Sequence, residues 1–216
     1  MENINPIINF FIAEGIPFET VILILMLPII ATFIAFLRQV VGIKAFGIYT
    51  PLIITFAFLA TNGIKYGIAI FLVVILSGML MRFILKPLRL LYLPRVAIML
   101  SLVALVVLFM LTLGGNFRRT GLASVSIFPI LIMITLVEKF VAVQIEKGNK
   151  TAIILTLETL LISVIGFYIA SWRELIIILS TWPWIVLMTI PVNFFLGKWT
   201  GLRLSEYLRF REILKK

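Results

Sequence analysis

The sequence predicts an all-α, polytopic membrane helix bundle with seven transmembrane helices, arranged as a 3+3 inverted repeat plus one helix, N-out and C-in. Three observations support this fold class. Hydrophobic residues make up 62% of the 216 residues, whereas soluble domains are roughly 45–50% apolar. These residues form seven long apolar stretches. The basic residues gather on one side of the membrane that these stretches define.

The seven stretches approach the roughly 20 residues that a helix needs to cross about 30 Å of hydrocarbon. They lie near Thr20–Leu37, Ala45–Ala60, Tyr66–Leu85, Val96–Leu113, Leu122–Val137, Thr151–Ala170 and Leu175–Leu196. Residues 1–18 contain no Lys or Arg and are expected to be an extracytoplasmic lead-in. The seven-helix membrane domain then covers residues 19–197, and a cytoplasmic tail covers residues 198–216.

Lys and Arg residues set the orientation of the bundle. If all seven stretches cross and the N-terminus lies outside, 15 of the 19 Lys and Arg residues lie inside. The outer ones are Lys65, Arg118, Arg119 and Arg173. This distribution follows the positive-inside rule, and six or eight crossings would destroy it.

The two shortest stretches carry related proline segments, Gly47–Pro51 and Val125–Pro129. Since the first runs from inside to outside and the second from outside to inside, the repeats are inverted. Repeat one covers residues 19–86, repeat two covers 96–170, and helix seven covers 174–197. We expect this symmetry to bring Pro51 and Pro129 together near the membrane midplane, on shallow, tilted or broken helices.

Six residues are candidates for a substrate pathway. Glycine and proline free backbone groups that lipid cannot satisfy, so the proline segments should face protein or a wet cavity. Glu158 is expected about 12 Å into its helix, where a carboxylate is expensive. It is either a substrate, proton or cation contact or the structural partner of an arginine such as Arg82. The candidates are Lys44, Gly47, Pro51, Ser126, Pro129 and Glu158.

Other features favour structural or docking roles. Glu138 beside Lys139 is interpreted as a solvated helix end, and the GxxxG pattern of Gly63–Gly67 as a close helix contact. The tail is basic and amphipathic, so it is expected to lie on the inner leaflet or to dock a cytosolic partner. Its docking candidates are Arg203, Arg209 and Arg211.

The composition excludes several kinds of chemistry. The chain has no cysteine, no histidine and no aspartate, so a thiol nucleophile, a His-based triad, the usual zinc site and paired aspartates are excluded. We therefore expect a protein that is not an enzyme and uses no metal or cofactor. The net charge of +10 is explained by membrane orientation and does not indicate nucleic acid.

Three segments carry a resemblance to a known family. They are Arg38–Pro51, Ser126–Pro129 with Glu138–Phe140, and Thr200–Arg211, which ends in Arg-Leu-Ser-Glu-Tyr-Leu-Arg-Phe-Arg. They resemble the bacterial seven-transmembrane domain usually fused to an inactive transglutaminase-like domain. The common form carries that domain outside the membrane before the helices. Here its contribution is expected to be absent or supplied by an extracytoplasmic partner chain.

The proline segments are also similar, more weakly, to the small membrane subunit of capsular poly-γ-glutamate synthesis. Both resemblances imply a cytosolic ATP-dependent amide ligase as partner, of the ATP-grasp or the Mur-ligase-like type. They imply a non-catalytic subunit of the bacterial inner membrane that anchors or conducts a peptide or poly-glutamate-like product. The alternative is an autonomous secondary transporter that uses Glu158 as its proton or cation site. The sequence leaves homo-oligomers open.

Overall fold

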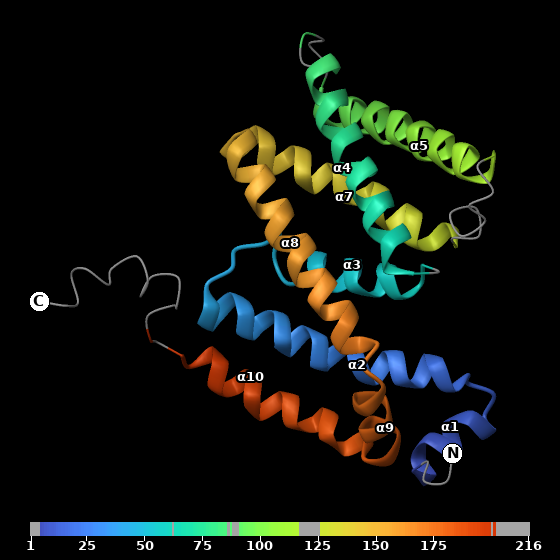
Figure 1. Cartoon of the computed structure of the whole chain (residues 1–216). Helices are drawn as coiled ribbons and strands as arrows, with labels where there is room; N and C mark the ends of the chain where they lie inside the picture. Colours follow the sequence, from blue (N-terminus) through green and yellow to red (C-terminus); the bar gives the residue numbers. More distant parts are fainter. Residues whose placement is uncertain are drawn as a thin grey trace, which may run out of the picture. The chain divides into compact units, whose positions relative to one another are not determined.

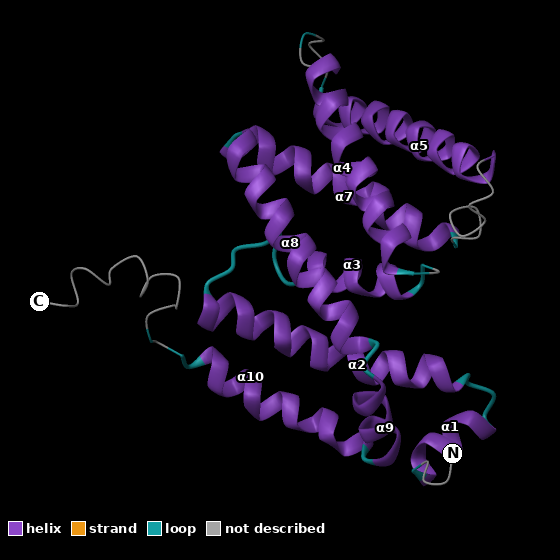
Figure 2. Ribbon diagram, viewed as in Figure 1, coloured by secondary structure: helices purple, strands orange, loops and turns teal. Residues whose placement is uncertain are grey.

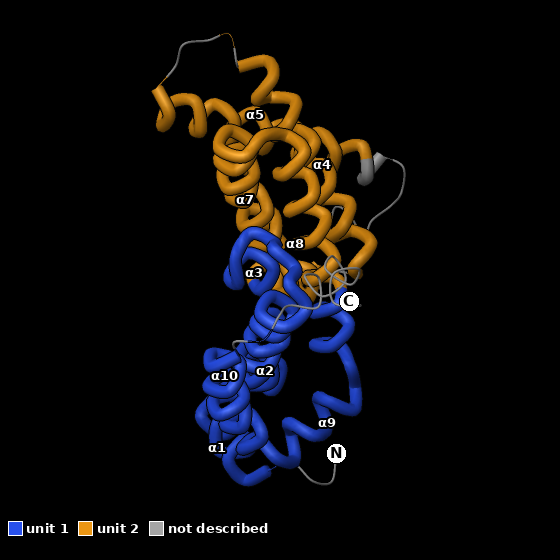
Figure 3. The backbone as a smooth tube through the Cα atoms, turned by 90° about the vertical axis from the view of Figure 1, so that its left-hand side faces the viewer, with its two compact units in different colours: residues 1–52, 165–216 blue, residues 53–164 orange. Residues whose placement is uncertain are grey.

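The computed structural model describes residues 5–61, 63–85, 87, 91–116, 126–199 and 201. Throughout these ranges the regular elements are helices, which confirms the predicted all-α class (Figure 2). The chain divides into two compact units (Figure 3). Unit 1 comprises residues 1–52 and 165–216, and unit 2 comprises residues 53–164.

Unit 1 is built from both ends of the chain. Its helices are α1 Pro6–Ala13, α2 Phe18–Phe36, the π-helix η1 Leu37–Val41, α9 Arg173–Thr181, the 3₁₀-helix η2 Pro183–Met188 and α10 Thr189–Gly197 (Figure 1). Helix α2 packs against α10 and also contacts α1 and α9. The Asn193 amide on α10 donates to the Thr32 hydroxyl on α2 at 2.7 Å. The backbone N–H of Asn5 donates to the Ser180 carbonyl at 2.9 Å, which joins the two ends of the chain.

The last predicted stretch, Leu175–Leu196, is broken rather than continuous. Helix α9 ends at Thr181, and the chain bends by 102° before the segment Pro183–Gly197. Proline lacks a backbone N–H and blocks the preceding turn, so Pro183 starts a new helix instead of continuing α9. The expectation of a single helix seven over residues 174–197 is therefore wrong at this point.

Unit 2 contains the longest helices. They are α4 Ile64–Leu85, α5 Tyr92–Asn116, α7 Ile127–Lys147 and most of α8 Asn149–Ala170, together with the end of α3 Tyr49–Leu59. Helix α4 packs against both α5 and α7, and α5 also contacts α7. The core of unit 2 is mainly apolar, with fully buried side chains from every one of these helices, among them Phe58, Phe71, Val103, Met133, Val137, Phe140 and Ile162.

Two glycines of α4 allow this packing. A Cβ atom added at Gly78 would lie 2.6 Å from Cγ1 of Val137, and one added at Gly67 would lie 2.6 Å from Cδ1 of Phe58. Carbon atoms cannot approach so closely, so α7 and α3 lie where only glycine admits them. The GxxxG prediction is thus correct for Gly67. Gly63 has φ +137° and precedes α4, where it helps the chain to turn into the helix.

Five helices in the described ranges are long and apolar enough to cross a membrane, and the number is six if the bent pair α9 and η2–α10 counts as one broken span. These findings establish a polytopic membrane bundle. The predicted stretch Ala45–Ala60 corresponds to α3, which has 11 residues and spans only about 16 Å at 1.5 Å per residue. It is too short to cross about 30 Å of hydrocarbon alone.

The prolines of the two repeated segments begin helices and do not break them. Pro51 is the third residue of α3, and Pro129 is the third residue of α7. The first N–H groups of a helix have no partner within the helix, so a proline there removes no hydrogen bond. The second segment is not a broken helix, because α7 continues for 21 residues to Lys147. A shallow or tilted position in the membrane stays a prediction.

Candidate functional site

Helix α7 carries a charged pair in its middle. Glu138 and Lys139 follow an apolar first half, and the helix then continues to Lys147 before it ends at Gly148. Glutamate and lysine are good helix formers, and neither glycine nor proline interrupts the residues that follow. Our interpretation of Glu138 as a solvated helix end is therefore wrong, and its carboxylate lies within a candidate membrane span.

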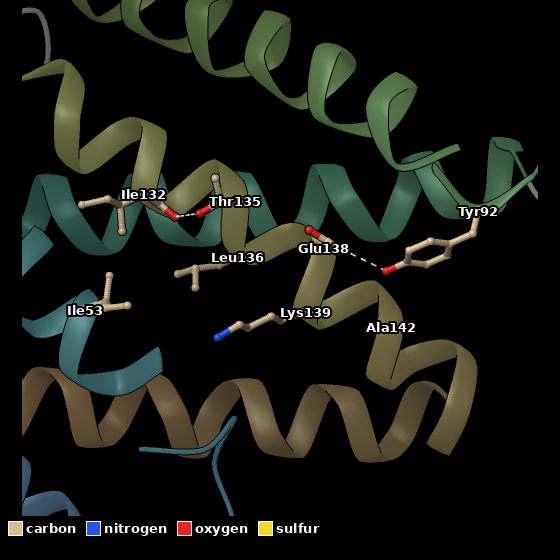
Figure 4. Close-up of a pocket in the computed structure, with 8 residues that line it drawn as sticks. All are labelled: Ile53, Tyr92, Ile132, Thr135, Leu136, Glu138, Lys139 and Ala142. Carbon is tan, nitrogen blue, oxygen red and sulfur yellow. Dashed lines mark hydrogen bonds between the residues drawn. The ribbon is translucent and has the colours of Figure 1, made fainter. Parts of the chain in front are cut away.

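Glu138 and Lys139 line a pocket of about 400 Å³ in unit 2. Residues from α3, α5 and α7 line it: Ile53, Tyr92, Ile132, Thr135, Leu136, Glu138, Lys139 and Ala142 (Figure 4). Four of these side chains are aliphatic, and the other four carry a hydroxyl or a charge. Ligand sites commonly combine an apolar lining with a small number of placed polar groups.

A hydrogen bond holds one of the charged groups in place. The Tyr92 hydroxyl donates to Oε1 of Glu138 at 3.1 Å. Tyr92 is the first residue of α5, so this bond joins the start of α5 to the middle of α7. The Thr135 hydroxyl instead donates to the Ile132 carbonyl of its own helix at 2.7 Å. Tyrosine thus restrains the carboxylate, while the threonine hydroxyl is already engaged as a donor.

Helix α7 shows why the pocket has this composition. Its residues at 133, 137, 140, 141 and 144 are buried, and they recur at the spacing of one helix face. Glu138 and Lys139 are exposed on another part of the helix. The side of α7 that packs against Gly78 of α4 is therefore mainly apolar, apart from Gln144, and the charged pair lies in the pocket lining.

A polar corner fixes the end of α7. Asn149 Oδ1 accepts hydrogen bonds from Arg82 Nη1 at 3.1 Å and from Gln144 Nε2 at 3.0 Å. Gln144 is only 1% exposed, and its Oε1 is buried with no hydrogen-bond donor. Gly148, with φ +84°, provides the single-residue turn between α7 and α8. This corner connects α4, α7 and α8.

Glu158 lies on α8 and is partly buried. Its neighbour Thr159 is fully buried and donates to the Leu155 carbonyl at 2.6 Å, while Thr156 donates to the Ala152 carbonyl at 2.8 Å. These threonines therefore satisfy their donors within α8. Arg82, the suggested structural partner of Glu158, donates to Asn149 instead. Asn149 precedes Glu158 on α8 by about 13 Å along the helix axis, at 1.5 Å per residue.

The other pathway candidates fall in two groups. Lys44, Gly47 and Pro51 belong to unit 1, where Lys44 is exposed and Pro51 buried. Ser126, Pro129 and Glu158 belong to unit 2, where Ser126 is the exposed N-cap of α7 and Pro129 is buried. The meeting of the two proline segments stays a prediction. Arg203, Arg209 and Arg211 lie outside the described residues.

The approach to Pro51 has an unusual backbone. Helix α2 continues into the π-helix η1, and Gly42 after it has φ +91°. Ala45 has φ +34° and is 6% exposed, a conformation that residues with a Cβ rarely adopt. Its surroundings therefore hold it there. The sequence indicated an irregular segment at this place, and the structure confirms that irregularity.

The pocket itself was not predicted. Tyr92 and Glu138 are 46 residues apart, and no local spacing connects them. One signal was present, because Glu138–Phe140 belongs to the segments that carry the family resemblance. A charged pair inside an apolar helix is expensive unless it is functional or paired, and this cost could have identified the site.

Comparison with known families gives one result. The family described as seven transmembrane helices usually fused to an inactive transglutaminase matches residues 6–214, which is nearly the whole chain. This match confirms the first resemblance. No curated protein and no solved structure matches the chain.

Proposed function

The chain belongs to the family of seven-transmembrane-helix proteins usually fused to an inactive transglutaminase, and from this membership we propose its function. It is a non-catalytic subunit of the bacterial cytoplasmic membrane that works with a cytosolic ATP-dependent amide ligase. It anchors or conducts a peptide or polyamino-acid product of that ligase. The protein is oriented N-out and C-in, with inverted repeats whose proline segments begin α3 and α7.

The pocket of unit 2 is the observation that carries this proposal. It places an ammonium group, a carboxylate and a phenol hydroxyl in apolar surroundings, which suits binding of a charged organic molecule. The chain contains no cysteine or histidine that would supply a nucleophile or base of the common kinds. Binding and guidance of a product made elsewhere therefore fit these residues better than catalysis.

The repeat, though not its inversion, is supported by a shared local feature. In α3 and α7 alike, a proline occupies the third helical residue, although one helix has 11 residues and the other 21. The basic residues support the orientation. Arg82, Lys147 and Lys150 lie around the turn between α7 and α8 and at the end of α4, on the side assigned to the cytoplasm.

Co-purification tests the complex. The full chain, extracted in mild detergent from its native membrane, is expected to retain an ATP-dependent amide ligase. In cells, Lys139→Gln is expected to reduce the exported or membrane-retained product, while Lys150→Gln at the exposed start of α8 provides the matched control. Repeated isolation of the chain without any ligase, combined with normal product in the Lys139 variant, would overturn the proposal.

A second candidate function is an autonomous secondary transporter. The depth of Glu158 favours it, because this carboxylate lies near the middle of a 22-residue candidate span, Asn149–Ala170. Liposomes that contain only this chain are then expected to show substrate-dependent proton or sodium flux. Glu158→Gln would abolish the flux while the protein remains folded. Absence of flux from the wild-type chain alone would reject this alternative.

A further inference from the structure

The pocket of unit 2 presents two opposite charges at separate points. Consecutive residues of an α-helix leave it about 100° apart, and the side chains of Glu138 and Lys139 point in different directions from α7 (Figure 4). The carboxylate of Glu138 is directed toward Tyr92, and the ammonium of Lys139 extends on the side of α7 that carries the pocket wall near Ile53. A bound molecule therefore meets an acidic and a basic group at different positions.

This arrangement does not suit a simple polyanion. A molecule that carried only carboxylates would gain from Lys139 but would be repelled by Glu138, since like charges a few ångströms apart destabilise each other. A molecule with only an ammonium group would face the opposite problem. A single molecule that carries both an ammonium and an anionic group places an opposite charge near each residue.

The size and lining of the pocket restrict the body of that molecule. A volume of about 400 Å³ lies at the lower end of the range of roughly 300–1,000 Å³ for small-molecule sites. Ile53, Ile132, Leu136 and Ala142 form an apolar wall, which favours a short apolar portion. Tyr92 restrains the Glu138 carboxylate at 3.1 Å, so the acidic group is held in place for a partner.

The geometry points to a binding site for a zwitterionic, amino-acid-like group, with its ammonium at Glu138, its anionic group at Lys139 and its apolar portion against α3 and α7. This inference rests on the proposed function and deepens it, because it names the end of a peptide-like product that the site recognises. The recognised end carries a free amino group and an anionic group within a few atoms of each other.

A series of three probes tests this chemistry on the full chain in detergent micelles by titration calorimetry. L-Leucine carries both charges, N-acetyl-L-leucine carries only the carboxylate, and L-leucinamide carries only the ammonium. Loss of one charge-assisted contact is expected to weaken binding about tenfold or more. L-Leucine should bind most tightly, and equal binding of all three probes, or none of any, would overturn the inference.

Two variants assign the charges to residues. Glu138→Gln is expected to abolish the preference for L-leucine over N-acetyl-L-leucine, and Lys139→Gln the preference for L-leucine over L-leucinamide. The matched controls are Glu146→Gln and Lys147→Gln, which change exposed residues of the same helix outside the pocket. If the control variants lose the preferences as strongly, the assignment to this pocket is wrong.

The same chemistry occurs in a free amino acid and in the phosphatidylethanolamine headgroup. Nanodiscs of phosphatidylglycerol, with and without an added equal share of phosphatidylethanolamine, distinguish these sources. Competition by phosphatidylethanolamine, lost in Glu138→Gln, assigns the site to the lipid. L-Leucine binding that is insensitive to the lipid assigns it to the free molecule. If phosphatidylethanolamine does not compete and L-leucine does not bind, the site is rejected.

The outcomes separate this inference from the proposed function. If the ligase co-purifies but no probe binds, the pocket assignment fails and the complex stands. If the probes bind with the expected preferences but no ligase accompanies the chain, the proposed function fails and the zwitterion site stands.

Discussion

Helices α3 and α7 begin alike and end differently. Each has proline as its third residue, and each packs against a glycine of α4, with Phe58 at Gly67 and Val137 at Gly78. Helix α3 stops after 11 residues. The hydroxyl of Thr61 donates to the Phe58 carbonyl at 2.7 Å, and Gly63 then turns the chain.

Helix α7 continues to Lys147 and ends at Gly148, and its middle residues Glu138 and Lys139 line the pocket. The difference shows that the repeated proline segments fix how the helices start, while the residues after them decide what each helix does. Glu138 and Lys139 lie beyond the shared proline segment of α7, and α3 has no equivalent charged pair within its helix.

The largest expected effect is at the contact of α7 with α4. Gly78→Ala would place a methyl group 2.6 Å from Val137, a fully buried residue whose branched side chain has one favoured rotamer in a helix. Overpacking of this kind costs about 2 kcal/mol. The thermal midpoint in detergent should fall by about 5 °C.

Val137→Ala supplies the matched test for Gly78→Ala. If the clash is the cause, the double variant should be more stable than the sum of the two single variants predicts, because the smaller side chain leaves space for the new methyl group. Strict additivity of the two effects would show that α4 and α7 do not meet at this contact.

The second largest loss of stability is expected at the C-terminal end of α7, where Asn149 joins α7 to α4 by hydrogen bonds that have no counterpart described at the end of α3. Asn149→Ala removes the side-chain oxygen that accepts hydrogen bonds from Arg82 and Gln144, so the amide of buried Gln144 loses this acceptor. An unsatisfied buried donor costs about 1–2 kcal/mol. Gln144→Leu is the informative companion, because it also removes the orphaned Oε1 and should be nearly neutral. Thermal unfolding of both variants tests whether Asn149→Ala is the more destabilising of the two.

Much of this fold follows from elementary rules applied to the sequence. Apolar runs located the spans because lipid requires them, and α3 was expected to be short. The errors arose where the apolar run and the helix differ. Glu138 and Lys139 end the apolar run but continue the helix, and Pro183 lies within an apolar run but breaks the helix.

The site could be predicted only in part. Glu158 was proposed from its cost in lipid, but it does not line the pocket of unit 2 and its role stays a prediction. The irregular backbone before Pro51 was expected from its glycines. The pocket depends on a contact between α5 and α7 that follows from tertiary packing, so Tyr92 has no local signal. Glu138 and Lys139 were visible in the sequence, but their role depended on where α7 ends.

A smaller effect is expected where α3 meets α4. Gly67→Ala would place a methyl group 2.6 Å from the Phe58 ring and 3.0 Å from Oγ1 of Thr61. Helix α3 is short and can shift more easily than α7, and alanine is a better helix former than glycine by about 1 kcal/mol. We expect a net loss of about 1 kcal/mol, measured as a smaller fall in the thermal midpoint than that of Gly78→Ala. The reverse order would show that α3 is the more rigidly held helix.

The smallest effects are expected at the prolines themselves. Pro51→Ala and Pro129→Ala change residues in the first turn of their helices, where the missing N–H has no partner to lose. Each variant should unfold within about 0.5 kcal/mol of the wild type. Product formation by the complex then gives the decisive readout. If both variants are stable but the product is lost, the two proline segments form the pathway. If the product is unchanged as well, the prolines serve only to start their helices, and the pocket of unit 2 acts without them. A fall in stability of several kcal/mol for either variant would contradict the helix-start role itself.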